Sequence, residues 1–460
     1  MPTHWVWLYS DGLLWWLVLL VMIYVVHVWR HPHLQAPWRK VASHRVGMVA
    51  AVVLCFYAGI CLLDSLHWQA TVTDTHGVTQ TRTVSALDHL LPKTMRESER
   101  SYSSPLSQQA FTLSSWQDVK GKSIRGYAPL EAVVNTEYPA HDVMMRLLRG
   151  AAIGIGVVLG LYLLVNLFQG FRQGVSRWQS IKTVWSGQSV YAWRAVWITL
   201  LLLSVLACVG WQLADGYHLM GTTQVGQDVL YESIKSIRTG IVIGTLTTLF
   251  MLPLALILGL CAGYFGGWCD DIIQYCYITL SSIPGVLLIS ATILVLQVTI
   301  HQHADWFPTM EARADIRLLA LCLILGLTSW ATLCRLLRAE TMKLKHMDYV
   351  SVSKTLGVSS ARLLCRHILP NVMHMVMITI VLDFSGLVLA EAVLSYVGVG
   401  VDPTTFSWGN MINSARLEMA REPMVWWPLI SALIMMFGLV LSANCFADAV
   451  RDAWDPRVSQ

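Results

Sequence analysis

Nine apolar runs, each about as long as a membrane-spanning helix, constrain this chain more than any other feature. A bilayer core requires about 20 apolar residues in a helix, and an isolated segment can satisfy its backbone there only by being helical. Of the 460 residues, 55% are hydrophobic and only 13% are charged, whereas a soluble domain carries about 25% charged residues. We therefore predict an all-α polytopic membrane protein with about nine transmembrane helices, at residues 12–29, 46–64, 150–168, 195–213, 239–263, 274–297, 316–334, 372–394 and 428–450.

The charges between these runs predict an orientation. The loops 30–45 and 169–194 contain arginines and lysines but no acid, and such loops are typical of the cytoplasmic side. The N-terminus is then periplasmic and the C-terminus cytoplasmic. Arg146 and Arg149, beside the third run, oppose this bias.

Four segments follow from this topology. We expect an N-terminal two-span extension at 1–64, a periplasmic insert at 65–149, a third span with a cytoplasmic linker at 150–194, and a core at 195–460. Within the polar insert, the stretch Thr71–Val84 predicts a short hairpin, because His76-Gly77 lies at its centre.

A basic loop at 335–370 separates two of the apolar runs and contains helix boundary signals. Asp348 is a good N-cap for a helix over about Tyr349–Leu356, and Gly357 follows where a left-handed residue ends a helix. Ser359 or Ser360 can cap a second helix, which ends or kinks at Pro370. The pattern predicts helix, glycine turn and helix at the membrane surface, although any structured cytoplasmic loop could show it.

This loop resembles the coupling loop of ABC-importer permeases of the dipeptide/oligopeptide/nickel family. The matching residues are Tyr349, Val350, Leu356, Gly357 and the run Arg366–Asn371, whereas Ser351-Val352-Ser353 replaces the family's Glu-Ala-Ala. A glutamate at position 351 could close a capping box, which Ser351 does only weakly. Further similar segments follow in order across residues 195–460: Gly221–Asp228, with Thr223 and Gln227 in place of Asp and Arg, Gly263–Trp268, Glu391–Gly400, Ser407–Asn410 and Asp448–Arg457.

The resemblance implies a six-helix permease core in a bacterial inner membrane. It implies a second permease subunit, two ATP-binding subunits and a periplasmic substrate-binding protein as partners. The chain would then be no enzyme and hold no cofactor, with ATP and Mg bound by the ATP-binding subunits. The substrates would be di- or oligopeptides, or alternatively nickel or another small solute. The residues implied in ATPase coupling are Tyr349, Val350, Ser351, Lys354, Leu356, Gly357, Val358 and Arg362.

Two acidic residues in the eighth run are candidates for the translocation pathway. Asp383 and Glu391 lie about two helical turns apart and therefore near one face, and ionisable groups inside spans are usually functional. Alternatively, Glu391 packs near the outer end and Asp383 bonds a neighbouring helix. Similarly, Gly259, Gly263, Gly266 and Gly267 could allow close helix packing or only form a turn.

Other motifs do not support different chemistry. Gly121-Lys122-Ser123 lacks the first glycine of a phosphate-binding loop, since Trp116 stands there, and no HExxH or CxxC occurs. A net charge of +4 is too small to indicate a nucleic-acid partner. The pairs His31/His33 and His301/His303 are either solvated or part of a metal-responsive channel. A membrane scaffold or sensor with an inactive permease core is the remaining alternative.

Overall fold

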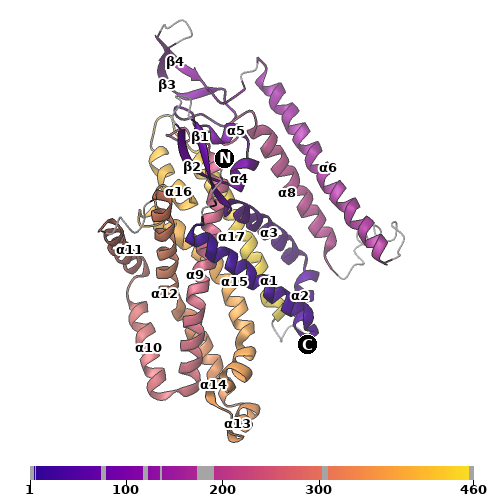
Figure 1. The fold of residues 1–460 in the computed structure, drawn as a ribbon, viewed down its shortest axis with the longest axis vertical. Coiled ribbons are helices and arrows are strands. Elements are labelled where there is room, and N and C mark those ends of the chain that lie inside the picture. Colours follow the sequence, from indigo (N-terminus) through magenta and orange to yellow (C-terminus); the bar gives the residue numbers. More distant parts are fainter. Residues whose placement is uncertain are drawn as a thin grey trace. The chain divides into compact units, whose positions relative to one another are not determined.

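The fold is known from a computed structural model that describes residues 5, 7–73, 79–117, 123–134, 137–173, 191–302 and 309–454 (Figure 1). Within these residues strands occur only as two hairpins. Among the described residues, eight helices are long and apolar enough to cross a membrane, or up to nine if one bent pair counts as a span. The prediction of an all-α polytopic membrane protein with about nine spans is therefore confirmed.

The long helices follow the apolar runs but extend beyond several of them. Their bounds are α1 (Tyr9–Arg30), α3 (Arg45–Asp64), α6 (Pro139–Gln173), α8 (Trp193–Ala214), α9 (Val229–Phe265), α12 (Met310–Lys345), α15 (Leu369–Tyr396) and α17 (Trp427–Trp454). The predicted starts at 150 and 239 are wrong, because α6 and α9 begin earlier. Likewise, α12 continues through the basic stretch to Lys345, which contains no glycine or proline to end it.

The chain forms two compact units. The first comprises Met1–Trp7, His33–Thr239 and Phe406–Ala449, and the second comprises Leu8–Pro32, Gly240–Thr405 and Val450–Gln460. Helix α9 belongs to the first unit up to Thr239 and to the second from Gly240. The first unit also contains two shorter helices that were not predicted, α2 (Pro32–Ser43) and α16 (Trp408–Glu418). Of α2, only Pro32 belongs to the second unit.

In the first unit, α6 packs against α8 through glycines. A Cβ added to Gly150 would lie 2.7 Å from Cα of Val209, and one added to Gly154 would lie 2.7 Å from Cα of Val205. The Ser204 hydroxyl donates a hydrogen bond to the Gly154 carbonyl at 3.1 Å. Small residues thus allow the two backbones to approach closely, as is common between membrane helices.

The early start of α6 gives a partner to Arg146, one of the two basic residues that oppose the predicted orientation. Arg146 lies within α6, and its Nε donates to Asp142 Oδ2 at 2.8 Å, one turn earlier. Its guanidinium also donates to the Gln212 carbonyl at 3.2 Å. The charge of Arg146 is therefore paired within the first unit, whereas Arg149 is exposed.

The insert contains two antiparallel hairpins and two short helices. The first hairpin pairs β1 (His67–Thr73) with β2 (Thr79–Ser85), which confirms the predicted hairpin, although its turn at 74–78 lies outside the described residues. The second, β3 (Gln109–Gln117) with β4 (Ser123–Pro129), was not predicted. Between them lie α4 (Ala86–Leu90) and α5 (Lys93–Arg96).

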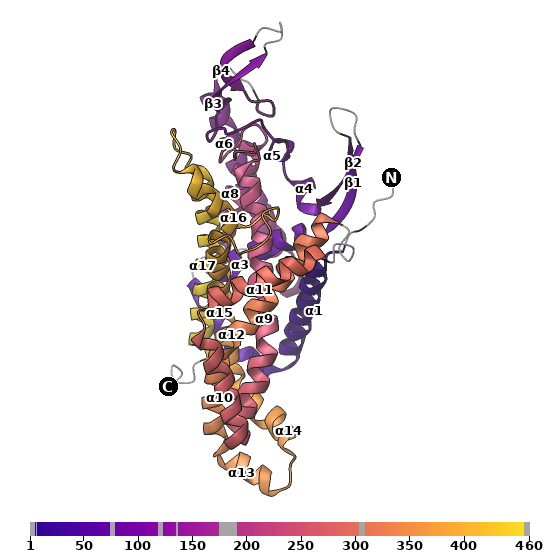
Figure 2. The ribbon, with the colours of Figure 1, turned by 90° about the vertical axis from the view of Figure 1, so that its left-hand side faces the viewer.

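In the second unit, the predicted span at 274–297 is two helices rather than one. Helices α10 (Gly267–Ser282) and α11 (Gly285–Gln302) meet at an angle of 87°, beside Pro284, which cannot donate a backbone hydrogen bond (Figure 2). Asp270 of α10 pairs with Arg338 near the end of α12, and the Gln297 side chain of α11 lies beside Arg317 near the start of α12. The bent pair therefore runs from one end of α12 to the other, which favours a broken span over a re-entrant loop.

The four glycines near the end of α9 divide between the two roles left open by the sequence. A Cβ on Gly259 would lie 2.9 Å from Leu337 Cβ, and one on Gly263 would lie 2.6 Å from Thr341 Cβ, so both allow α9 to pack closely on α12. Gly266 and Gly267 have φ of 66° and 52° and form the turn into α10.

Candidate functional site

The basic loop after α12 folds as two short helices around a glycine. Helix α13 (Asp348–Thr355) is followed by α14 (Ser360–Leu363) and by one turn of π-helix, η2 (Leu364–Ile368), which continues into α15. Figure 2 shows α13 and α14 at the same end of the second unit as the turn between α9 and α10. The predicted arrangement of helix, glycine turn and helix is therefore present, but the second helix does not end at Pro370, which lies in the first turn of α15.

The predicted start of α13 is wrong by one position. Met347 is the N-cap residue and Asp348 is the first helical residue, without a side-chain capping bond. Asp348 still lies in the first turn, where a carboxylate interacts favourably with the helix dipole. Ser351 is consequently the fourth helical residue, so neither it nor a glutamate at this position could complete a capping box.

Gly357 ends α13 through a Schellman motif. The Gly357 N–H donates to the Lys354 carbonyl at 3.1 Å, and the Val358 N–H donates to the Ser353 carbonyl at 3.2 Å. This pair of bonds requires a left-handed residue, and Gly357 has φ of 78°. A Cβ at Gly357 would meet nothing within 4 Å, so the glycine is required by the backbone conformation alone.

One side of the loop is anchored in the apolar core of the second unit. Val350, Leu363 and Ile368 are buried, with Val358 partly buried beside them. They belong to the same core cluster as Leu337 of α12. The cluster fixes the short helices to the end of the long helix, so movement of one requires movement of the other.

Polar contacts add to this anchorage. Tyr349 Oη accepts a hydrogen bond from Asn371 Nδ2 at 3.0 Å, which links α13 to α15. The Lys345 ammonium lies 5.9 Å from the centre of the Tyr264 ring, a cation–π distance. Arg338 binds Asp270 through two hydrogen bonds of 2.5 and 2.7 Å, which link α12 to α10.

The opposite side of the loop exposes apolar surface. Leu356, the C-cap residue of α13, is 78% exposed, and Val352, one turn earlier in the helix, is 55% exposed. Tyr349 is 41% exposed, while Ser351, Lys354 and Arg362 provide an exposed polar surround. Val352 was absent from the predicted site, although its spacing of four from Leu356 could have revealed it. We call Tyr349, Val352 and Leu356 the apolar face of α13.

The two pathway candidates lie on α15 and not in the loop. Glu391 is 2% exposed, and its Oε1 accepts a hydrogen bond from Ser395 at 2.7 Å. Asp383 is half-buried. The burial of Glu391 favours the packing role that the sequence left open, and Asp383 remains the stronger pathway candidate.

The described residues offer no cluster of three or more His, Cys, Asp or Glu side chains that could hold a metal ion. His303, Gly121 and Lys122 lie outside the described residues. The loop thus combines a rigid base with an exposed apolar face, and these features suit a docking element better than a catalytic centre. Together with the long apolar helices, they define a multi-pass membrane protein with an exposed loop of two short helices.

Comparison with known proteins gives this class a family. Residues 255–460 match the family described as binding-protein-dependent transport system inner membrane component. The oligopeptide transport system permease protein OppC of Mycobacterium bovis is 29% identical over 239 residues, which are 52% of this chain and 76% of the relative. The corresponding protein of Bacillus subtilis is 29% identical over 52% of this chain and 72% of its own.

Two further relatives are named for other substrates. The dipeptide transport system permease protein DppC of Lactococcus lactis is 28% identical over 53% of this chain and 65% of its own. The glutathione transport system permease protein GsiD of Pectobacterium atrosepticum is 27% identical over 52% of this chain and 73% of its own. These matches agree with the resemblance given by the loop motifs: residues 255–460 are similar to binding-protein-dependent transport permeases of peptide importers.

Proposed function

We propose that this chain is the translocation subunit of an ATP-driven importer that moves di- or oligopeptides across a bacterial inner membrane. In this proposal the apolar face of α13 docks on one of two ATP-binding subunits, which bind ATP and Mg. A second permease completes the pathway, and a periplasmic binding protein delivers the substrate. The N-terminus is periplasmic and the C-terminus is cytoplasmic.

One observation carries this proposal: an exposed apolar face on a short helix that is rigidly attached to a membrane-spanning helix. Leu356 is 78% exposed, yet the neighbouring Val350 and Leu363 are buried in a core shared with α12. Such a helix can transmit a displacement from a docked partner to the spans, because packed cores move as units. ATP binding would then favour one state of the pathway over another.

The substrate class has separate support. The relatives are named for oligopeptide, dipeptide and glutathione transport, and all these substrates have a free amino group. Asp383, half-buried in α15, is the residue of this chain that we propose meets such an amine, with Glu391 as a less accessible second carboxylate. Uptake of a dipeptide that falls in Asp383→Asn but persists for an N-acetylated analogue would support this role.

The docking role is tested by reversing the polarity of the face. We expect Leu356→Glu to abolish ATP hydrolysis that depends on this chain, measured after co-purification with its partner subunits. Leu417→Glu is the matched control, since Leu417 is a similarly exposed leucine (68%) on the short helix α16. Equal ATPase activity in both variants and the native chain would overturn the docking role and favour a scaffold or sensor with an inactive core.

A further inference from the structure

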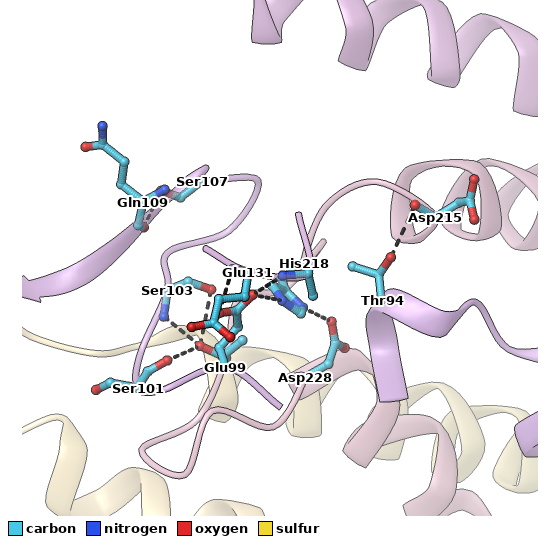
Figure 3. Close-up of polar contacts among 12 residues, drawn as sticks. Thr94, Glu99, Ser101, Ser103, Ser107, Gln109, Glu131, Asp215, His218 and Asp228 are labelled. Carbon is cyan, nitrogen blue, oxygen red and sulfur yellow. Dashed lines mark hydrogen bonds and ion pairs between the residues drawn. The ribbon is translucent and has the colours of Figure 1, made fainter. Parts of the chain in front are cut away.

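A buried histidine joins the insert to the beginning of α9. His218 Nδ1 lies 2.7 Å from Asp228 Oδ2, and its Nε2 lies 3.7 Å from Glu99 Oε1. Figure 3 shows the imidazole between these two carboxylates. All three side chains are buried. Glu99 comes from the insert, while Asp228 immediately precedes α9, where its Oδ1 accepts from the Tyr231 N–H at 2.9 Å.

The two carboxylates favour the charged form of the imidazole. Burial by itself lowers the pKa of His218, but the hydrogen bond with Asp228 and the negative charges of Asp228 and Glu99 raise that pKa to about 9. Burial likewise raises the pKa of Glu99, but His218 and the N–H groups of Ala132 and Glu131 bring it below its ordinary value. At neutral pH the arrangement is therefore one buried cation between two buried anions.

Backbone hydrogen bonds join the same two segments, the insert and the connection before α9. Glu99 N–H donates to the Gly226 carbonyl at 2.9 Å, Thr222 N–H donates to the Ser103 carbonyl at 3.1 Å, and Leu106 N–H donates to the His218 carbonyl at 3.0 Å. We call Glu99–Leu106 the strap, because it lies along the connection between α8 and α9. The approach is close: a Cβ on Gly226 would lie 1.7 Å from the Glu99 carbonyl oxygen.

We propose that His218 is an ionic latch, whose protonated ring closes the strap over the beginning of α9 and whose deprotonation opens it. The loss of one proton would leave two buried carboxylates without a cation, which is costly. The latch is a property of the first unit alone. It can therefore be tested without transport, and its failure would not affect the proposed function.

A second ionic cluster limits how far the insert could open. Lys235 Nζ of α9 lies 2.7 Å from Asp64 Oδ1 and 2.9 Å from Asp88 Oδ1. Ser85, which ends β2, is within the same cluster. Since these groups do not include His218, the hairpin of β1 and β2 should stay attached when the strap opens.

Other charged groups lie on the elements packed around the latch. The insert carries the exposed ion pair of Arg100 and Glu131. On α6, Arg146 pairs with Asp142 and with Asp215, which follows α8. The acids Glu232 and Glu418 lie on α9 and α16, and Arg421 lies over the Tyr102 ring. The carboxylates paired with the ring of His218 are Asp228, through a hydrogen bond, and Glu99, through an ion pair at 3.7 Å.

The test is pulsed hydrogen exchange of the full chain in nanodiscs, read by mass spectrometry and corrected for intrinsic exchange at each pH. We expect the strap amides of Glu99, Leu106 and their partner Thr222 to exchange about tenfold or more faster at pH 10 than at pH 7. Amides of β1 and β2 should remain protected. His218→Gln and Glu99→Gln should each show the open rates already at pH 7.

Glu131→Gln is the matched control, because it removes a carboxylate from the same segment but from a pair that is exposed. It should exchange like the native chain. The latch would be refuted if the native strap were equally protected at pH 7 and pH 10, a result that depends on no variant. It would also be refuted if His218→Gln kept native protection at pH 7.

Discussion

At the scale of single residues, the α13 loop depends most on Gly357. Its left-handed conformation is required by the two hydrogen bonds that end the helix, and no neighbouring atom limits what side chain could be added. We expect Gly357→Val to cost about 1–2 kcal/mol locally and to reduce ATPase activity that depends on this chain. Thermal unfolding of the spans should be unchanged, because the strain lies in an exposed turn.

Gly357→Asn is the matched control for this prediction, since asparagine tolerates the left-handed region better than valine. It should retain most of the coupled activity. If valine and asparagine behaved alike, the conformation of the turn would not be what matters at this position.

At the scale of elements, the packing of α6 on α8 depends on glycine spacing. A Cβ added to Gly154 would lie 2.7 Å from Cα of Val205, whereas a Cβ added to Gly156 on the same helix would meet nothing within 4 Å. We expect Gly154→Leu to destabilise the protein by about 1–3 kcal/mol through overpacking. Gly156→Leu should leave stability unchanged. Thermal unfolding of the two variants in the same detergent measures the difference, and equal midpoints would contradict this packing.

At the scale of the whole molecule, Lys235 joins parts of the chain that are far apart in sequence. Its ammonium binds Asp64 at the end of α3 and Asp88 in the insert, and all three residues are buried. We expect Lys235→Met to destabilise the protein by about 3–5 kcal/mol, because two buried carboxylates lose their cation. Combining it with Asp64→Asn and Asp88→Asn should recover much of that loss, as denaturant titration would show.

The same cluster predicts an acid limit to stability. Burial by itself raises the pKa of Asp88, but Lys235 and hydrogen bonds from Ser85 and Tyr231 bring it below its ordinary value. The unfolded chain has an ordinary Asp pKa of about 4. A carboxylate whose pKa is lower in the folded state stabilises the protein above that pH, and this stabilisation is lost as the pH falls through the folded-state pKa. Unfolding midpoints measured from pH 6 to pH 3 should therefore fall less in Asp88→Asn than in the native chain.

Much of the helical framework could be predicted because its cause is local. An apolar run must form a helix in a bilayer wherever it lies in the chain, and the turn at Gly357 depends on neighbouring residues only. The misplaced boundaries share one reason: a helix continues past its apolar part until a breaker or a cap ends it. Thus α12 runs on to Lys345, and α6 begins at Pro139, where proline is favourable in a first turn.

The contacts between distant segments could not be predicted in this way. Nothing local to Glu99 or His218 indicates that they meet, because each contact depends on how the insert folds back on the core. The break between α10 and α11 is similar, since Pro284 permits a bend but its size depends on packing against α12.

The sequence by itself therefore determined the apolar spans, the basic loop around Gly357 and the resemblance to a permease family, because hydropathy, helix signals and motifs act over short distances. The tertiary structure decided which face of α13 is exposed, which charges are buried together and how the insert is fastened. Burial and ion pairing depend on the positions of many residues at once, and local signals do not specify those positions.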